Sequence, residues 1–144
     1  MTQAAMIAEM LGGTNVLKQR IRRESELESA VREGLPARSV RSLAEKTLTT
    51  LSQLQAVTRI DRSTYARRVR ARSKLKTEES DRVVRVARIA TLAVEAMGKA
   101  DGLAWLHEPN RALGERVPIA LLETEVGARQ VEQVLARIEH GIIG

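Results

Sequence analysis

The sequence contains no cysteine and very few aromatic residues. The absence of cysteine excludes disulfides, thiolate metal sites and a cysteine nucleophile. Among its 144 residues there are one tryptophan, one tyrosine and no phenylalanine. Because strands are enriched in aromatic residues, a core made of leucine, isoleucine, valine and alanine favours helices packed on helices. We therefore predict an all-α fold.

Long apolar runs and the common motifs of enzymes are also missing. No apolar run approaches the roughly 20 residues that span a bilayer, and residues 1–13 lack the basic start of a signal peptide, so we expect a cytoplasmic protein without membrane contacts. The chain has neither GxGxxG nor a Walker lysine motif, and His107 and His140 have no companions at zinc-ligand spacing. We expect no metal, no cofactor and no catalytic residue, and hence no enzyme.

Positive charge is concentrated in one stretch of the chain. The net charge is +6, yet residues 59–76 contain eight basic residues and one acidic residue, so that the rest of the chain sums to −1. A local charge of +7 favours a polyanionic partner, and nucleic acid is the usual one. The alternative is a basic surface that is merely solvated.

The same stretch has the spacing of a helix-turn-helix motif. Leu51, Leu54 and Val57 lie on one face of a short helix, and Ile60 falls in a turn. Either Asp61 or Ser63 can cap the helix that follows. That second helix has a basic face, which we expect to point outward into DNA. The predicted DNA-binding residues are Arg62, Ser63, Thr64, Arg67, Arg68, Arg70 and Arg72. The competing interpretation is an ordinary helical hairpin.

Three further helices are predicted on either side of this motif. Apolar positions from Val16 to Val31 predict a helix that ends at Gly34, and Pro36 suits the first turn of the next one. A long helix begins with Thr77 as its N-cap and ends at Gly98. Its three arginines are expected to form an outward row, which either flanks DNA or is solvated. These are Arg82, Arg85 and Arg88.

After Gly98 the pattern changes to short elements and turns. Trp105 is the only tryptophan, Pro109-Asn110 signals a turn, and Pro118 opens a short helix. The last helix is capped by Thr124 and ends at Gly141. Its apolar face consists of Val131, Val134, Leu135 and Ile138. The apolar pair Ile142-Ile143 then predicts a segment that packs on its own domain or on a partner.

A series of short motifs resembles one family of bacterial proteins. The motifs are Leu11-Gly12-Gly13, Val16-Leu17, Gly34-Leu35-Pro36, Arg67-Arg68, Leu75, Glu79-Ser80-Asp81-Arg82, Trp105-Leu106, Pro109-Asn110, Pro118, Thr124, Gly127, Val131, Leu135, Arg137-Ile138 and Gly141. In this order they resemble the Xre/MbcA/ParS-type antitoxins. Three positions depart from the family pattern. Arg59 stands where the turn of the helix-turn-helix often has glycine, and Gln55 where its first helix often has alanine. Glu115 stands where a second glycine follows Gly114.

The resemblance implies an Xre-like helix-turn-helix core followed by a helical toxin-binding domain. It implies an antitoxin that neutralises a NAD-consuming RES-domain toxin by covering its active site, and that represses its own operon as a homodimer within a larger hetero-oligomer. The implied organisation is an N-terminal helical segment at 1–33, a helix-turn-helix DNA-binding domain at 34–98 and a toxin-binding domain at 99–144. The expected toxin-binding residues are Trp105, Leu106, Pro109, Asn110, Leu121, Arg137, Ile138, His140, Gly141, Ile142 and Ile143.

Two alternatives to an antitoxin stay open at this point. The chain could be a stand-alone transcriptional repressor whose C-terminal third serves dimerisation. It could also be a basic RNA- or ribosome-associated protein, although single-stranded RNA is usually bound by stacking on aromatic side chains and the basic stretch offers Tyr65 alone.

Overall fold

The computed structural model describes residues 1–141, and their secondary structure is helical apart from two isolated β-bridges. The elements are α1 (Gln3–Met10), α2 (Gly13–Leu17), α3 (Glu24–Glu33), α4 (Ser39–Thr47), α5 (Leu51–Thr58), α6 (Arg62–Ala71), α7 (Thr77–Met97), α8 (Lys99–Trp105), the 3-10 helices η1 (Arg111–Leu113) and η2 (Pro118–Glu123), and α9 (Glu125–Glu139). The prediction of an all-α fold is confirmed. Ile142 and Ile143 lie outside the described residues.

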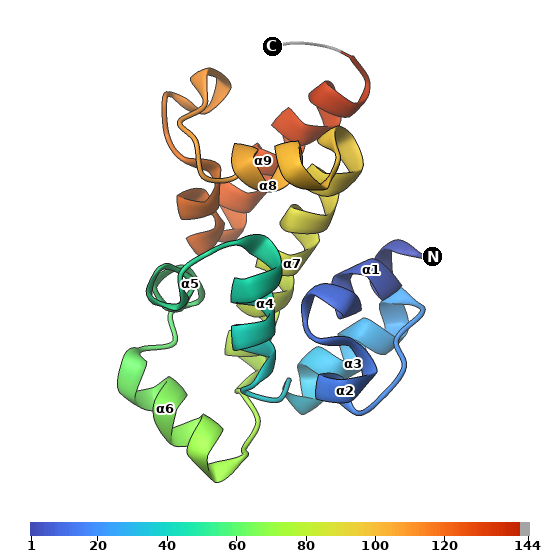
Figure 1. Ribbon diagram of the computed structural model, residues 1–144, viewed down its shortest axis with the longest axis vertical. Coiled ribbons are helices and arrows are strands. Elements are labelled where there is room, and N and C mark those ends of the chain that lie inside the picture. Colours follow the sequence, from blue (N-terminus) through green and yellow to red (C-terminus); the bar gives the residue numbers. More distant parts are fainter. Residues whose placement is uncertain (142–144) are drawn as a thin grey trace.

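Helix α7 forms the centre of the molecule (Figure 1). It is 21 residues long and packs against α1 and α3 from the N-terminal part of the chain and against α8, α9 and η2 from the C-terminal part. Val83, Val86, Ala87 and Ala90 on this helix are completely buried. A helix that is apolar on several sides belongs in the interior of a helical protein, so α7 connects both ends of the chain through one core.

The N-terminal segment differs from the prediction of a single helix over Val16–Val31. Lys18 ends α2 in a left-handed conformation with φ 60°, and α3 starts only at Glu24. The intervening turn is held by Glu26, whose carboxylate accepts hydrogen bonds from the N–H groups of Arg22 (2.9 Å) and Arg23 (3.0 Å). These bonds, led by the one from Arg22, lower the pKa of Glu26. Helix α1 lies inside the segment 1–33 that is predicted to be helical, but the apolar pattern does not indicate it as a separate helix.

Two predicted helix starts also require correction. Pro36 precedes α4 and forms an isolated bridge with Lys74, so it does not occupy the first turn of that helix. Thr77 is the first residue of α7 and not its cap; its hydroxyl donates to the carbonyl of Arg32 at 3.1 Å. The end of α7 is as predicted, because Gly98 terminates it with φ 88°.

The three arginines of α7 do not form a free cationic row, because each has a partner in another helix. Arg82 donates to the carbonyl of Thr58 at the end of α5 (2.6 Å), and Arg88 pairs with Glu24 of α3 (2.6 Å). Arg85 pairs with Glu125 of α9 (3.5 Å). Burial, and then the nearby charges of Arg59 and Arg85, lower the pKa of Arg82. The three side chains therefore connect α7 to three other helices.

Within residues 1–141, no helix is long and apolar enough to cross a membrane. The same residues contain no group of three or more histidine, cysteine, aspartate or glutamate side chains that could hold a metal ion.

Candidate functional site

The turn between α5 and α6 has the geometry predicted for a helix-turn-helix. Arg59 adopts the left-handed conformation (φ 55°, ψ 43°), and Ile60 directly after it is completely buried. This conformation favours glycine, which has no Cβ, so Arg59 maintains the turn without the usual residue. Its guanidinium also donates to the carbonyl oxygen of Glu123 (3.3 Å) and lies 3.6 Å from the carboxylate of that residue.

Asp61 starts α6 and organises its first turn. Its carboxylate accepts hydrogen bonds from the N–H of Thr64 (2.8 Å) and the hydroxyl of Ser63 (3.0 Å). The bond from the Thr64 backbone is the main cause that lowers the pKa of Asp61, followed by the side-chain bond from Ser63. Of the two caps that the sequence allows, the structure selects Asp61 and not Ser63. The charged carboxylate of Asp61 also suits the helix N-terminus.

Most predicted DNA-binding residues are exposed on α6 or at its C-cap, Arg72. The exposed members are Arg62, Ser63, Arg67, Arg70 and Arg72, and Thr64 is half-buried. None of the ion pairs found among residues 1–141 uses Arg62, Arg67, Arg70 or Arg72. These four cations can therefore neutralise phosphate groups without first losing an internal partner. We call this set of arginines the α6 basic surface.

The outward orientation predicted for Arg68 is wrong. Its side chain is 13% exposed and pairs with the carboxylate of Glu79, which is 9% exposed. In a helix, residues 65, 68 and 69 share a face, and Tyr65 and Val69 are the apolar residues of α6 that turn towards the rest of the protein. Arg68 therefore belongs to the inner face, and Arg67 to the outer one.

The C-terminal residues form a second candidate surface at the opposite end of the molecule, far from α6 (Figure 1). Pro109, Arg137, His140 and Gly141 are exposed. Trp105, Asn110 and Ile138 are half-buried, and Trp105 and Ile138 pack against the core with part of their side chains left accessible.

Two residues predicted to bind toxin are core residues instead. Leu106 is 0% exposed and Leu121 is 7% exposed. The backbone carbonyl of Leu106 accepts from the N–H of Ile119 at 3.0 Å, which fixes the end of α8 against η2. A partner cannot contact these side chains without opening the domain, so they support the C-terminal surface from below.

The turn after Pro109 explains the departure from the family pattern at Glu115. Asn110 caps η1 through its side chain, and its backbone pairs with Arg116 in an isolated bridge. Gly114 and Glu115 both have left-handed backbones, with φ 67° and 66°. Glu115 thus occupies a conformation that favours glycine and completes the loop with its N–H donating to Asn110 (2.8 Å).

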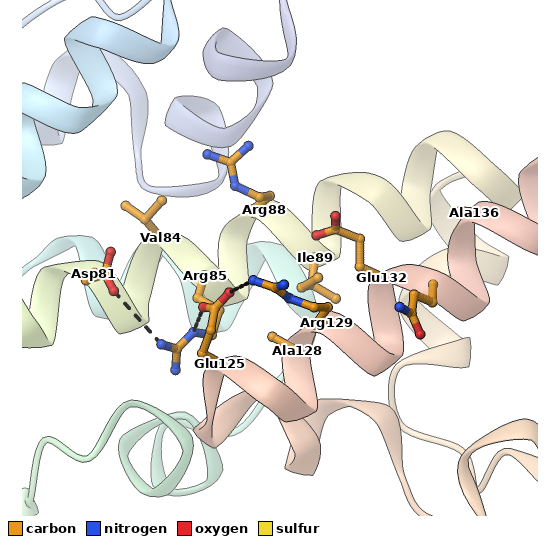
Figure 2. A pocket seen from close by; sticks show the side chains of 11 residues that line it. Asp81, Val84, Arg85, Arg88, Ile89, Glu125, Ala128, Arg129, Glu132 and Ala136 are labelled. Atoms are coloured by element: carbon orange, nitrogen blue, oxygen red, sulfur yellow. Dashed lines mark ion pairs between the residues drawn. The ribbon is translucent and has the colours of Figure 1, made fainter.

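A groove of about 640 Å³ runs between α7 and α9 (Figure 2). Arg85 and Arg129 both point towards Glu125, at 3.5 Å each, and Arg88 points away towards the N-terminal helices. The groove contains three arginines and three acidic residues, the latter being Asp81, Glu125 and Glu132. Because these charges balance, the groove has no preference for anions and the α6 basic surface remains the better phosphate site.

Comparisons with known proteins match two consecutive parts of the chain to family models. Residues 26–88 match the model of the antitoxin Xre-like helix-turn-helix domain, and residues 93–141 match the antitoxin Xre/MbcA/ParS C-terminal toxin-binding domain. The protein "Antitoxin Xre" of Photorhabdus laumondii is 33% identical over 119 residues, which cover 81% of this chain and 80% of that protein. The chain belongs to the Xre antitoxin family.

Other members of the family align over different lengths. "Antitoxin Xre" of Pseudomonas putida is 27% identical over 95% of this chain and 92% of its own length. "Antitoxin Xre" of Yersinia enterocolitica is 42% identical, but over 45% of each chain. The "Prs ADP-ribosylating antitoxin" of a Sphingobium species is 38% identical over 46% of this chain and 48% of its own. The names of these relatives are those of antitoxins.

Several connecting residues of this antitoxin-family chain escaped the sequence analysis. His107 lies 3.2 Å from the carbonyl oxygen of Thr47 and 3.4 Å from the hydroxyl of Thr49, at the end of α4. The ion pair between Arg59 and Glu123 likewise connects α5 to η2. Each pair is more than 50 positions apart, so no local pattern reveals it. The one local signal was Arg59 itself, a non-glycine residue at a turn position.

Proposed function

We propose that this antitoxin-family chain binds its own operator through α6 and neutralises a RES-type toxin through its C-terminal domain. In this proposal residues 34–98 bind DNA, residues 99–144 bind the toxin and residues 1–33 form a helical N-terminal segment. The observation that carries it is the separation of the two surfaces at opposite ends of the molecule (Figure 1). DNA and toxin can then be held at the same time without a steric conflict.

Charge supports the assignment of DNA to the α6 end. The α6 basic surface has four exposed arginines without carboxylate partners among the described residues, whereas residues 98–144 have a net charge of −2. Neutralised phosphates release counterions and supply most of the affinity of such surfaces. The helix-turn-helix geometry places α6 where a recognition helix enters the major groove.

A gel-shift titration with a duplex from the region upstream of the antitoxin gene tests the DNA half. We expect Arg67→Ala with Arg70→Ala to weaken binding strongly and to reduce the slope of log K against log salt by about 1.8, or 0.9 per phosphate contact. The control, Arg20→Ala with Arg111→Ala, removes two exposed arginines elsewhere and should retain the slope. Equal binding by both double variants would overturn the assignment.

The toxin half rests on the C-terminal domain and on one relative. The name of the Sphingobium relative refers to ADP-ribosylation. This chemistry uses NAD as its donor, and RES toxins are likewise expected to consume NAD. We propose that the end of α9, with Arg137 and His140, covers the toxin's active site together with Ile142 and Ile143. We include Trp105, Pro109 and Asn110 in the proposed toxin-binding surface.

Co-expression with a RES-domain toxin tests this half. Deleting residues 140–144 should restore toxicity, while the truncated chain remains soluble and keeps its unfolding midpoint. Growth rescue by the truncated chain would instead move the inhibitory contact to the Trp105–Leu122 region. If the full chain binds the upstream duplex but forms no complex with the toxin, the stand-alone repressor becomes the correct description. Light scattering on the free chain and on the complex tests the proposed homodimer and hetero-oligomer.

A further inference from the structure

Residues 79–82 of α7 make three separate contacts. Their partners lie in α6, in the segment before α4 and at the end of α5. Glu79 pairs with Arg68 of α6, and Ser80 accepts from the N–H of Leu35 at 2.9 Å. Arg82 donates to the carbonyl of Thr58 at the end of α5 (2.6 Å). We call this segment the Glu79–Arg82 turn. None of these contacts involves a residue of the α6 basic surface.

Helix α6 has few other attachments to the protein. Tyr65 is the only buried residue of α6, which the structure describes in full, and Val69 packs against the core half-buried. Figure 1 shows α6 at one extremity of the molecule, away from α8 and α9. Three arginines of this short helix are exposed, namely Arg62, Arg67 and Arg70. The Arg68–Glu79 pair is therefore a large part of what determines the orientation of α6 relative to α7.

A second donor, besides Arg68, fixes the position of the Glu79 carboxylate. The carboxylate also accepts the N–H of Lys76 at 2.8 Å, in the first turn of α7. The Lys76 N–H and the Arg68 guanidinium both contact Oε1 of this carboxylate, so one oxygen holds two donors and the side chain has little freedom to move. Removing one partner of such a pair leaves an uncompensated buried charge, which is strongly destabilising locally.

We propose that Arg68 is a positioning residue for operator binding, which acts through Glu79 and does not contact phosphate. Arg67, adjacent in the sequence and on the outer face, makes the phosphate contact. The proposal rests on the proposed function, since it assumes that α6 enters the operator. The two adjacent arginines then have different roles: Arg67 contacts phosphate, and Arg68 fixes the orientation of α6.

The two roles of Arg68 predict opposite signs for Glu79→Gln in gel shifts with the upstream duplex. If Arg68 contacted phosphate, loss of the opposing carboxylate would release it and strengthen binding. The positioning role predicts binding about tenfold weaker, with a salt slope equal to that of the wild type because no phosphate contact is lost. The matched control is Glu78→Gln, which removes an exposed carboxylate from the same turn and should bind as well as the wild type or slightly better. Unchanged or tighter binding by Glu79→Gln would overturn the proposal.

Two further measurements keep the test decisive. Glu79→Asp retains the charge but shortens the side chain by one methylene, so it avoids an unpaired buried arginine and should also bind more weakly than the wild type. Amide hydrogen exchange should become roughly tenfold faster at residues 62–71 in Glu79→Gln and not at residues 125–139. If the wild type itself fails to bind the duplex, the proposed function fails, and unchanged exchange in α6 would then refute the positioning role separately.

Discussion

Replacing Gly102 by alanine should destabilise the protein, although the same change normally stabilises a helix. Gly102 lies in α8, where it is buried against α7. A Cβ at this position would lie 2.5 Å from the carbonyl oxygen of Ala93 and 2.7 Å from its carbonyl carbon. Both are backbone atoms of a completely buried residue, so no side-chain rotation can relieve the overlap and α8 must move away from α7.

The magnitude follows from two opposing terms. Helix propensity favours alanine over glycine by roughly 1 kcal/mol. Overpacking of a core costs about 1–3 kcal/mol, and a backbone obstacle places this case at the upper end. The net loss is then about 2 kcal/mol, which for a chain of this size lowers the midpoint of thermal unfolding by roughly 6 °C.

Circular dichroism at 222 nm during heating, together with urea unfolding, measures the effect. The control is Ala104→Gly in the same helix, an exposed position where the loss of propensity alone costs about 1 kcal/mol. We expect Gly102→Ala to be the less stable of the two variants. An unfolding midpoint at or above that of the wild type would refute the steric argument, because propensity would then dominate.

Two further predictions concern the two candidate surfaces. The folded-state pKa of Asp61 is lowered from its ordinary value of 3.8. The stability that Asp61 contributes is therefore complete above pH 3.8, and it is lost as the pH falls through the lowered folded-state pKa. Asp61→Asn should flatten the pH dependence of unfolding in this acidic range, and an unaltered profile would contradict the role of the cap. Trp105→Ala should cost about 3 kcal/mol, since Trp105 packs against the core; an unchanged unfolding midpoint combined with lost toxin binding would make it an interface residue instead.

Helices that are marked by a cap residue or by apolar periodicity are predicted correctly from the sequence. Thr124 accepts from the N–H of Gly127 at 3.0 Å and starts α9 as expected, and the spacing from Val131 to Ile138 marks its inner face correctly. Asp61 caps the start of α6 with its carboxylate, and Gly98 ends α7 with a positive φ. Caps and periodicity lie within a few residues of each other, so a single sequence is enough to find them.

The errors concern residues whose partners are distant in the sequence. The direction of Arg68 depends on Glu79 in the next helix, and that of Arg88 on Glu24, which is 64 positions away. An arginine has the same local pattern whether it is solvated or paired, so charge counts alone make every arginine a candidate for DNA. The N-terminal break at Lys18 likewise depends on tertiary contacts, such as the bond from the Thr2 hydroxyl to the carbonyl of Arg22 (2.6 Å).

The central position of α7 bears on how such antitoxins can exchange specificity. Both matched family domains have an edge inside this helix, one ending at residue 88 and the other starting at residue 93. A chimera joined at Gly98 would set a foreign α8 and α9 on an α7 surface selected for other neighbours, with Ala93 facing a residue other than Gly102. Recombination that preserves stability must therefore transfer the second half of α7 together with the toxin-binding domain. The first half of α7 then stays with the helix-turn-helix domain.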